Sequence, residues 1–269
     1  MLTEAYDFRD ESEALYKLLE PLEDADYERV TLFKDWTIND VLQHLHFFNY
    51  AADLTRIDEE EFKRVYAAMS EIRTKTDSLV IATNEMLKGL KGKALREAWR
   101  EYYIEMAEKF AQEDPKRRLI WVGPTMSARS SISARLMETW SHAQEVYDVL
   151  GVERENTDRI RSIVVIGMNT FNWTFINRKE PIPGPVPHVR LTAPSGAIWE
   201  WNPENTNDRI EGEAAEFCQV VAQTRNVADT SLRVSGDVAT RWMAVAQCFA
   251  GVPRTPPTPG TRVINRKSA

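Results

Sequence analysis

Hydrophobic residues recur at helical spacing through the first two thirds of the chain. From about residue 8 to residue 178 they fall three or four positions apart, the period of an amphipathic α-helix, and few prolines or glycines interrupt them. This pattern predicts a run of long helices that each bury one face. The predicted helices cover about 8–20, 35–54, 59–89 as one helix or two, 92–112, a segment that follows the turn at 121–127 and ends before Gly151, and 157–177.

The second predicted helix has a clear start. Thr37 is a good N-cap because its hydroxyl can accept a hydrogen bond from a free backbone N–H, and Asp40, three residues later, completes a capping-box-like pattern. Once the start is fixed, the other residues of the helix can be assigned to faces. The apolar face is predicted to hold Ile38, Val41, Leu42, Leu45, Phe48 and Ala52.

The pattern changes after residue 178. The stretch EPIPGPVP, at 180–187, is too rich in proline to continue a helix. Alternating residues then predict a hairpin at 188–203, followed by helices at 211–224 and 237–250 with a short strand at 230–236 between them. We therefore expect a mainly α protein with three parts, a helical domain at 1–178, a small α+β domain at 183–252 and a Pro-rich flexible tail at 253–269.

Composition narrows the classes of partner. The 269 residues carry 34 Lys and Arg against 41 Asp and Glu, a net charge of −7, and 43% are hydrophobic. A folded core is therefore expected, whereas nucleic acid or an anionic membrane surface would need an excess of clustered cations. The N-terminus has no apolar signal region, and the longest strongly apolar run, IVVIGM, is too short to span a bilayer. We expect a cytoplasmic protein with small-molecule partners.

Common catalytic motifs are missing from the sequence. It has no Gly-rich phosphate loop, no G-x-S-x-G, no C-x-x-C and no H-E-x-x-H. The two cysteines, Cys218 and Cys248, lie beside apolar residues without metal-ligand spacing, so they are expected to be buried and reduced. Any chemistry must then come from other side chains.

Three polar residues occupy an unexpected face of the helix that ends before Gly151. In the stretch ARLMETWSHAQEVYDVLG, Arg135, Glu138 and His142 project within roughly 60° of one another, on the apolar stripe that includes Val146. Unpaired buried charges are unfavourable, so this face needs partners. Glu138 and His142, spaced i and i+4, can bind one metal ion together. The alternative is an ordinary Glu–His hydrogen bond, with Arg135 as the salt-bridge partner of Glu138.

The second helix offers a third ligand. His44 lies at one shoulder of its apolar face, and His46 lies at the opposite shoulder. If the two helices pack together, His44, Glu138 and His142 supply two imidazoles and one carboxylate. Three protein ligands leave coordination positions open to water and substrate, as in catalytic metal sites.

Two stretches carry a resemblance to a known superfamily. DWTINDVLQHL at 35–45 and ARLMETWSHAQEVYDVLG at 134–151 resemble the two signatures of the DinB-like, mycothiol-dependent maleylpyruvate isomerase N-terminal superfamily. The stretches at 208–226 and 236–251 resemble a subgroup of uncharacterised metal-binding proteins sometimes labelled with wyosine base formation. The resemblance implies a DinB-like four-helix bundle that binds a divalent metal through His44, Glu138 and His142.

The resemblance also implies an enzyme that uses the metal and a low-molecular-weight thiol, such as mycothiol, as cosubstrate. It would be an isomerase or S-transferase acting on a small electrophile, with Zn²⁺ as the expected ion and Ni²⁺, Mn²⁺ or Fe²⁺ as others that suit the ligands. Arg135 is a candidate for orienting Glu138 or meeting an anionic substrate group, and His46 for a proton shuttle or a packing role. Candidate pocket residues are Trp121, Met126, Ser130 and Thr139. The isomerases' C-terminal domain contributes an active-site arginine, for which Arg225 and Arg241 are candidates.

Two other functions stay open on the sequence alone. A non-catalytic protein, with a metal-stabilised bundle that binds an acyl or other apolar ligand or a protein partner, would be favoured by a fourth protein ligand such as His46, because structural metal sites are saturated. A role in tRNA modification, which the wyosine label implies, is disfavoured by the acidic balance and the lack of basic and aromatic clusters. A monomer and a homodimer paired through a helix face are both compatible with the pattern.

Overall fold

The computed structural model describes residues 1–123 and 125–264. Its contacts divide the chain into two compact units, Met1–Leu150 and Gly151–Ala269. The division lies earlier than residue 178, so the segment 151–178, expected in the helical domain, belongs to the second unit. Gly151 marks the boundary because it adopts a left-handed conformation (φ 73°) that ends the preceding helix, and 152–157 follows without a helix or strand.

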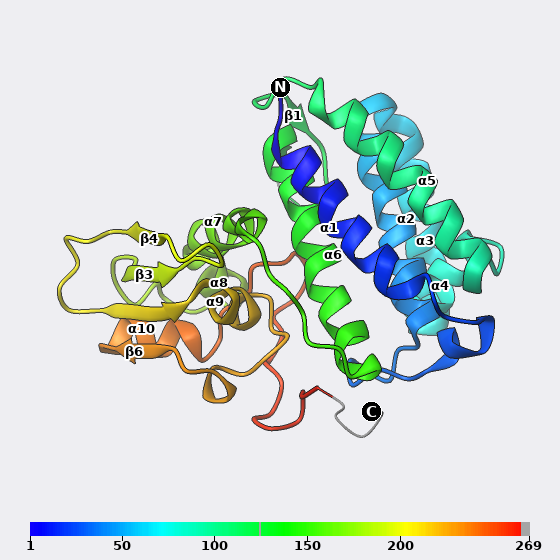
Figure 1. The fold of residues 1–269 in the computed structure, drawn as a ribbon. Helices are drawn as coiled ribbons and strands as arrows, with labels where there is room; N and C mark the ends of the chain where they lie inside the picture. Colours follow the sequence, from blue (N-terminus) through cyan, green and yellow to red (C-terminus); the bar gives the residue numbers. More distant parts are fainter. Residues whose placement is uncertain (124, 265–269) are drawn as a thin grey trace. The chain divides into compact units, whose positions relative to one another are not determined.

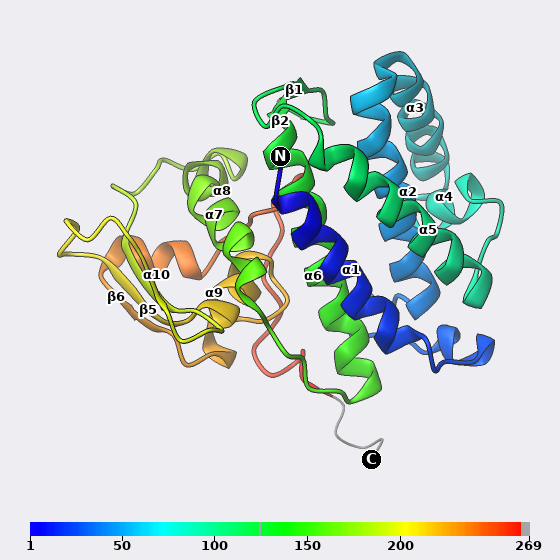
Figure 2. The ribbon, with the colours of Figure 1, turned by 45° about the horizontal axis from the view of Figure 1, so that its top comes forward.

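A four-helix bundle forms the first unit. Its helices are α1 (Glu4–Leu19), α2 (Ile38–Ile57), α5 (Gly92–Ala111) and α6 (Ala128–Leu150). Helices α1 and α2 each pack against both α5 and α6, which closes the bundle (Figures 1 and 2). Shorter elements lie between them: the 3₁₀ turn η1 (Asp24–Glu28), α3 (Glu59–Thr76), α4 (Leu79–Met86), β1 (Arg118–Leu119) and β2 (Met126–Ser127).

The bundle agrees with the sequence prediction in its main features. The mainly α fold class is confirmed, and each bundle helix lies within a few residues of its predicted range. The segment predicted at 59–89 as one helix or two is two helices, α3 and α4, which pack against each other and against α2. Asp77 separates them because it adopts a left-handed conformation (φ 50°) that α-helix cannot continue through.

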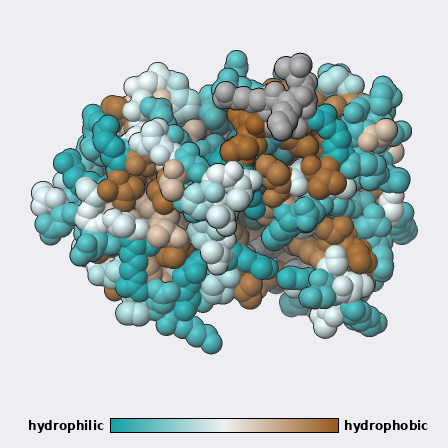
Figure 3. All heavy atoms as spheres, turned by 90° about the horizontal axis from the view of Figure 1, so that it is seen from below, coloured by the Kyte–Doolittle hydropathy of each residue, from teal (hydrophilic) through white to brown (hydrophobic). Residues whose placement is uncertain are grey.

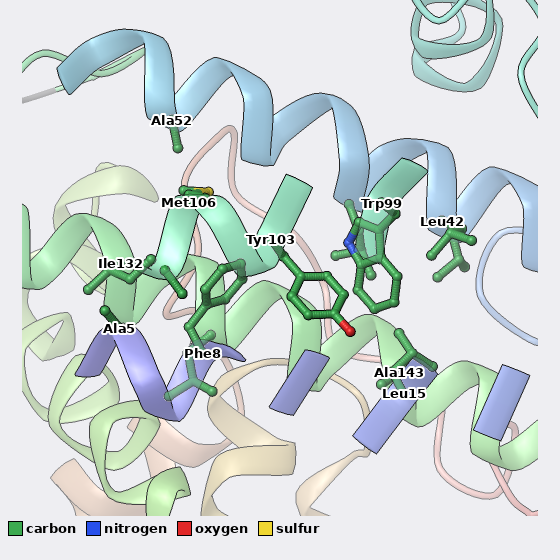
Figure 4. Packing of buried hydrophobic residues seen from close by; sticks show 14 of the residues in the cluster. Ala5, Phe8, Leu15, Leu42, Ala52, Trp99, Tyr103, Met106, Ile132 and Ala143 are labelled. Atoms are coloured by element: carbon green, nitrogen blue, oxygen red, sulfur yellow. The ribbon is translucent and has the colours of Figure 1, made fainter. Parts of the chain in front are cut away.

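Large and small side chains pack together in the core of the bundle. Phe8 of α1 and Tyr103 of α5 are neighbours in Figure 4, and their ring centroids lie 6.5 Å apart in an edge-to-face contact. Trp99 of α5 is fully buried, and small residues such as Ala52 of α2 and Ala143 of α6 are buried in the same cluster. Close packing of this kind fixes where the polar faces of the helices meet.

The start of α2 is fixed as the sequence predicted. Thr37 Oγ1 accepts a hydrogen bond from the Asp40 N–H at 3.1 Å, and Asp40 Oδ2 accepts one from the Thr37 N–H at 2.8 Å. Both bonds satisfy backbone donors that a helix N-terminus leaves without intrahelical partners. The capping box therefore sets where α2 begins, and with it the face on which His44 meets α6.

The second unit contains a four-stranded sheet and short helices, and the predicted small α+β fold is confirmed. The strand order is β4-β3-β5-β6, with β3 antiparallel to β4, parallel to β5, and β5 antiparallel to β6. The strands are β3 (His188–Thr192), β4 (Ile198–Trp201), β5 (Arg209–Glu213) and β6 (Arg233–Ser235). The helical elements are η2 (Asp158–Ile160), α7 (Arg161–Asn169), α8 (Phe171–Asn177), α9 (Ala214–Val221), η3 (Val227–Asp229) and α10 (Asp237–Met243).

Several boundaries in this unit correct the sequence prediction. The helix predicted at 157–177 is interrupted at Thr170, between α7 and α8. The helix predicted at 211–224 begins only at Ala214, because the residues before it pair with β3 as strand β5. The helix predicted at 237–250 ends at Met243. Pairing of β5 with the distant strand β3 explains the late start of α9. The ends of α7 and α10 were not predicted because no proline or glycine marks the break in the sequence.

The remaining sequence predictions concern cysteines, tail and surface. Cys218 and Cys248 are buried free thiols, as predicted. The described part of the tail, 253–264, contains no helix or strand. Among the described residues, no helix has both the length and the apolar character needed to cross a membrane. Hydrophobic residues on the face in Figure 3 lie in patches among hydrophilic ones, which is normal for folded proteins and marks no docking site by itself.

Candidate metal centre

Two helices of the bundle bring the predicted ligands together. His44 projects from α2, and Glu138 and His142 project from successive turns of α6. The Nε2 atoms of both histidines lie 3.4 Å from Glu138 Oε2, and one ligand atom of each residue lies within 4.8 Å of the others. The structure therefore assembles the three side chains that the sequence pattern singled out.

Both nitrogen–oxygen distances in this triad suit a shared metal ion. A nitrogen–oxygen separation of 3.4 Å is long for a hydrogen bond. Two ligand atoms that are each about 2.05 Å from a tetrahedral ion lie about 3.3 Å apart, close to the observed separation. Two imidazole nitrogens and a carboxylate oxygen are also donors that divalent first-row metals accept. The residues present therefore fit a divalent metal.

The ionisation of the triad matches the needs of metal ligands. Burial opposes the charge on Glu138, but hydrogen bonds with His142 and His44 outweigh it and hold the pKa of this carboxyl well below its usual value. Burial, followed by repulsion from His142, lowers the pKa of His44 to about 4. At neutral pH Glu138 is therefore ionised and His44 is neutral, with a lone pair free for coordination.

Aromatic rings enclose the two imidazoles. Trp36 stacks on His142, with 5.7 Å between centroids and 4° between planes, and Phe33 contacts the same imidazole edge-on at 5.1 Å. Phe48 of α2 lies 4.7 Å from the His44 ring, centroid to centroid. These contacts restrict rotation of both imidazoles, so their Nε2 atoms stay turned toward the carboxylate.

The loop before α2 positions Phe33 and Trp36. An isolated antiparallel bridge closes its base, and the Trp36 N–H donates to Phe33 O at 2.9 Å. Between them, Lys34 and Asp35 adopt left-handed conformations with φ of 53° and 57°. Such conformations are uncommon outside glycine, so the loop is a specific tight turn that presents both rings to His142.

A second polar group lies beside the triad. The Arg135 Nε–H of α6 donates to Asn49 Oδ1 of α2 at 3.0 Å, and Thr139 lies one turn after Arg135. All three side chains are buried, with Arg135 only 4% exposed. Burial lowers the pKa of Arg135 to about 10, and attraction to Glu138 opposes that shift, so the guanidinium stays charged at neutral pH. Within the described residues no hydrogen bond or ion pair joins Arg135 to Glu138.

The other predicted pocket residues lie at different places. Trp121 contacts Phe48, with ring centroids 6.4 Å apart, and so extends the aromatic wall beside His44. Thr139 lies in the polar group just described. Met126 is in β2, and Ser130 is in the first turn of α6, where its N–H bonds to the side chain before the helix. Both residues come two helical turns or more before Glu138 in the sequence, and they therefore lie away from the triad.

His46 points toward α5 and not toward the triad. Its ring contacts Tyr102 edge-on, with centroids 5.7 Å apart, and its buried Nδ1 has no hydrogen-bond partner among the residues that the structure describes. Burial lowers the pKa of His46 to about 4. A proton shuttle must exchange protons near the working pH, so this position favours the packing role over the shuttle.

The two arginine candidates and the fourth histidine lie in the second unit. His188 is buried, and its Nε2 lies 2.8 Å from Glu200 Oε1 across the β3–β4 pair. Arg241 forms an ion pair with Glu180 at 2.6 Å, and Arg225 is buried and donates to a neighbouring carbonyl. Cross-strand pairing explains the burial of His188, which its place at the start of a strand did not reveal.

Sequence reasoning missed two residues of the site. Phe33 precedes α2 in a loop with no glycine or proline to mark its turn, so nothing in the sequence placed it over His142. Asn49 was also hard to detect, because it lies five residues after His44 and therefore about 140° around α2 from it. Asn49 is the partner that the buried Arg135 side chain requires.

Comparison with known proteins places the chain in a family. Residues 8–147 match the profile of the mycothiol maleylpyruvate isomerase N-terminal domain. Two uncharacterised proteins from strains of Mycobacterium tuberculosis are each 34% identical over 247 residues, covering 92% of this chain and 95% of theirs. Among solved structures, the mycothiol-dependent maleylpyruvate isomerase is similar, with a TM-score of 0.51 and 16% identity over 82% of this chain and 88% of that one. A histidine-to-alanine mutant of that enzyme gives a TM-score of 0.50.

The structural similarity, at this low identity, supports the fold alone. The profile match is stronger evidence of family membership, because it covers more than half of the chain, including both helices that supply the triad. The chain therefore belongs to the family of the mycothiol maleylpyruvate isomerase N-terminal domain.

Proposed function

We propose that this protein is a divalent-metal-dependent enzyme that uses a low-molecular-weight thiol, such as mycothiol, in an isomerase or S-transferase reaction on a small electrophile. The observation that carries the proposal is the convergence of His44, Glu138 and His142 within an aromatic enclosure. Family membership supports the thiol, because mycothiol appears in the family's name and in that of the structural relative.

His44, Glu138 and His142 would hold the metal, for which we propose zinc. A bound zinc ion would lower the pKa of a coordinated thiol, so that the thiol is deprotonated near neutral pH. Glu138 supplies the negative charge of the ligand set, and the stacked Trp36 keeps His142 in position. Phe33 and Phe48 shield the imidazoles from water, which strengthens the electrostatic interactions in the site.

The thiol must come from outside the chain. Both cysteines are buried in the second unit, and burial raises the pKa of the Cys218 thiol well above its usual value. A buried protonated thiol is a poor nucleophile. An external thiol therefore fits the chemistry, and the three-ligand site leaves positions open to receive it.

A closed, purely structural metal site is less consistent with the described residues. Such a site needs a fourth protein ligand, and the group found here has three, with His46 turned toward Tyr102. We therefore prefer the catalytic hypothesis to the metal-stabilised binding protein.

The first experiment measures metal content by plasma mass spectrometry on untagged protein. Wild type is compared with His44→Ala, His142→Ala and the matched control His46→Ala, which removes an imidazole from the same helix as His44. We expect about one metal per chain in wild type and the control, and none in the two triad variants. A wild-type protein that cannot be loaded with any divalent ion would exclude the proposed site.

The second experiment tests the thiol. Mycothiol is titrated by calorimetry into zinc-loaded and chelator-stripped wild-type protein. Binding that requires zinc supports thiol chemistry at the metal. Normal zinc loading without any thiol binding would remove the thiol from the proposal and return the metal-stabilised binding protein as the better explanation.

A further inference from the structure

The C-terminal segment 251–262 is bound to the rest of the second unit through its backbone. At Arg254 both backbone groups have a side-chain partner. Gln247 Oε1 accepts from the Arg254 N–H at 2.8 Å, and Gln223 Nε2 donates to the carbonyl at 3.1 Å. Arg178 Nη2 donates to the same carbonyl. Side chains that are far apart in the sequence thus converge on one residue of a segment that has no helix or strand of its own.

Two further contacts follow Arg254 at intervals of three residues. Asn226 Nδ2 donates to Pro257 O at 2.8 Å. Asp229 Oδ1 accepts from the Gly260 N–H at 2.8 Å. The bonds again go to backbone atoms of the segment and not to its side chains.

The interval of three matches the conformation that the segment favours. Residues 253–258 form no helix, strand, turn or bend, and three of the six are proline. Proline favours the polyproline II helix, which has three residues per turn, so Arg254 and Pro257 lie on one face of it. Gly251 and Gly260, with left-handed φ of 112° and 75°, end the extended part on either side.

The two glutamines that bind the segment are themselves fixed. Gln223 is 7% exposed and Gln247 is 2% exposed. Gln223 Nε2 also donates to Ala246 O at 2.9 Å, and Gln247 Nε2 donates to Phe249 O at 3.3 Å. These bonds orient both amides toward the segment, where the buried Gln247 Oε1 meets a peptide N–H.

Side chains of the segment contribute less to its attachment. Arg254, Thr255 and Thr258 are exposed, and Pro256 and Pro257 are half-buried. A segment that belonged to the core would bury its side chains. One that is held by its backbone, in a conformation set by proline, has the features of a bound peptide.

We infer that Gln223, Asn226, Asp229 and Gln247 form a binding site for a peptide in the polyproline II conformation, and that residues 251–262 occupy it in cis as a releasable strap. The prolines reduce the entropy that the segment loses on binding. Its covalent attachment keeps it near the site at an effective concentration on the order of millimolar. All of these residues belong to the second unit, so the inference is independent of the metal centre.

The first measurement is amide hydrogen exchange by NMR on the full-length protein. We expect the Arg254 and Gly260 N–H groups to exchange at least about tenfold more slowly than the same groups in a free synthetic peptide of residues 251–262, because both are hydrogen-bonded. Exchange at the rate of the free peptide would show that the segment is not bound, and this would overturn the inference.

The second measurement separates a releasable ligand from a fixed part of the fold. The full-length double variant Pro256→Gly/Pro257→Gly keeps the backbone groups that the four side chains contact, but it gives the unbound segment more conformational freedom. The segment then competes less for its own site. A fluorescent peptide of residues 251–262 should therefore bind the double variant at least about fivefold more tightly than wild type. A folded double variant that binds no peptide would show that the segment is a fixed part of the fold.

Two asparagine variants in the same background show where the peptide binds. Asn226→Ala removes the donor to Pro257 O and should weaken peptide binding about fivefold. Asn169→Ala, at an exposed asparagine of α7, should leave it unchanged. Equal binding by the two would place the peptide elsewhere and overturn the site.

Wild type provides the test if the double variant does not fold. Free peptide at several millimolar should displace the segment and speed exchange of the Arg254 and Gly260 amides about twofold or more. Unchanged exchange at that concentration would show that the segment cannot be released, and the strap would be refuted.

Discussion

Replacing His46 with glutamine tests whether burial keeps this imidazole neutral. The pKa of His46 is lowered from 6.5 to about 4 by burial. As pH falls below 6.5, the unfolded chain binds a proton at this position while the folded chain does not. The unfolded state therefore binds more protons, and stability is lost as pH falls from about 6.5 toward 4.

The size of the effect follows from the shift. Each pKa unit corresponds to about 1.4 kcal/mol, so the full loss is about 3 kcal/mol, of which about 2 kcal/mol has been lost at pH 5. Because His46 is only partly buried, we expect 1–2 kcal/mol, roughly, at pH 5. The same shift in His44 acts equally in wild type and variant, and so cancels in the comparison.

The assay is urea unfolding of the full chain, followed by circular dichroism at pH 7.5 and 5.0 in the presence of a chelator. Wild type should lose about 1–2 kcal/mol more of its unfolding free energy between the two pH values than His46→Gln loses. Equal losses in the two proteins would refute the reasoning. They would mean that His46 is protonated in the folded protein at pH 5, and a proton-transfer role for it would become credible again.

Three further predictions follow from the first unit and the cysteines. Trp36→Leu should weaken zinc binding about tenfold in competition with a fluorescent chelator, because His142 loses the ring that restricts its rotation; an unchanged affinity would contradict a positioning role. Thr37→Ala should lower the unfolding free energy by about 1 kcal/mol in urea, through loss of the bond to the Asp40 N–H. Cys218 should react with a thiol-directed chromogenic reagent only after denaturant is added, and rapid labelling of native protein would show that the thiol is accessible.

Local chemistry made much of the bundle predictable. The start of α2 follows from Thr37 and Asp40 alone, since a capping box uses residues three apart in sequence. The end of α6 follows in the same way from Gly151. With both helices placed in register, the polar residues on their apolar faces could be paired, and the metal triad was within reach of the sequence.

Features that depend on distant parts of the chain were not predictable in this way. Strand β5 contains one buried apolar residue, Ile210, and was predicted in part as helix; its parallel pairing with β3 decides its conformation. The loop that carries Phe33 was equally hidden, because Lys34 and Asp35 adopt left-handed conformations without a glycine to indicate them. In both cases tertiary contacts override local preference.

The polar layer between α2 and α6, formed by Arg135 and Asn49, does not stabilise the bundle as well as apolar residues would. An apolar pair at the positions of Arg135 and Asn49 would pack the bundle without leaving donors unsatisfied, and each unsatisfied buried donor costs about 1–3 kcal/mol. The rest of the bundle core, with its fully buried aromatic side chains, supplies enough packing to tolerate this cost. The layer is also confined to the turns of α6 next to Glu138 and His142 and to the part of α2 that follows His44. The donors of this layer therefore adjoin the triad, but other unpartnered buried atoms of the described residues, such as Trp99 Nε1 of α5 and His46 Nδ1 of α2, lie elsewhere in the bundle, so its core tolerates such atoms at several places.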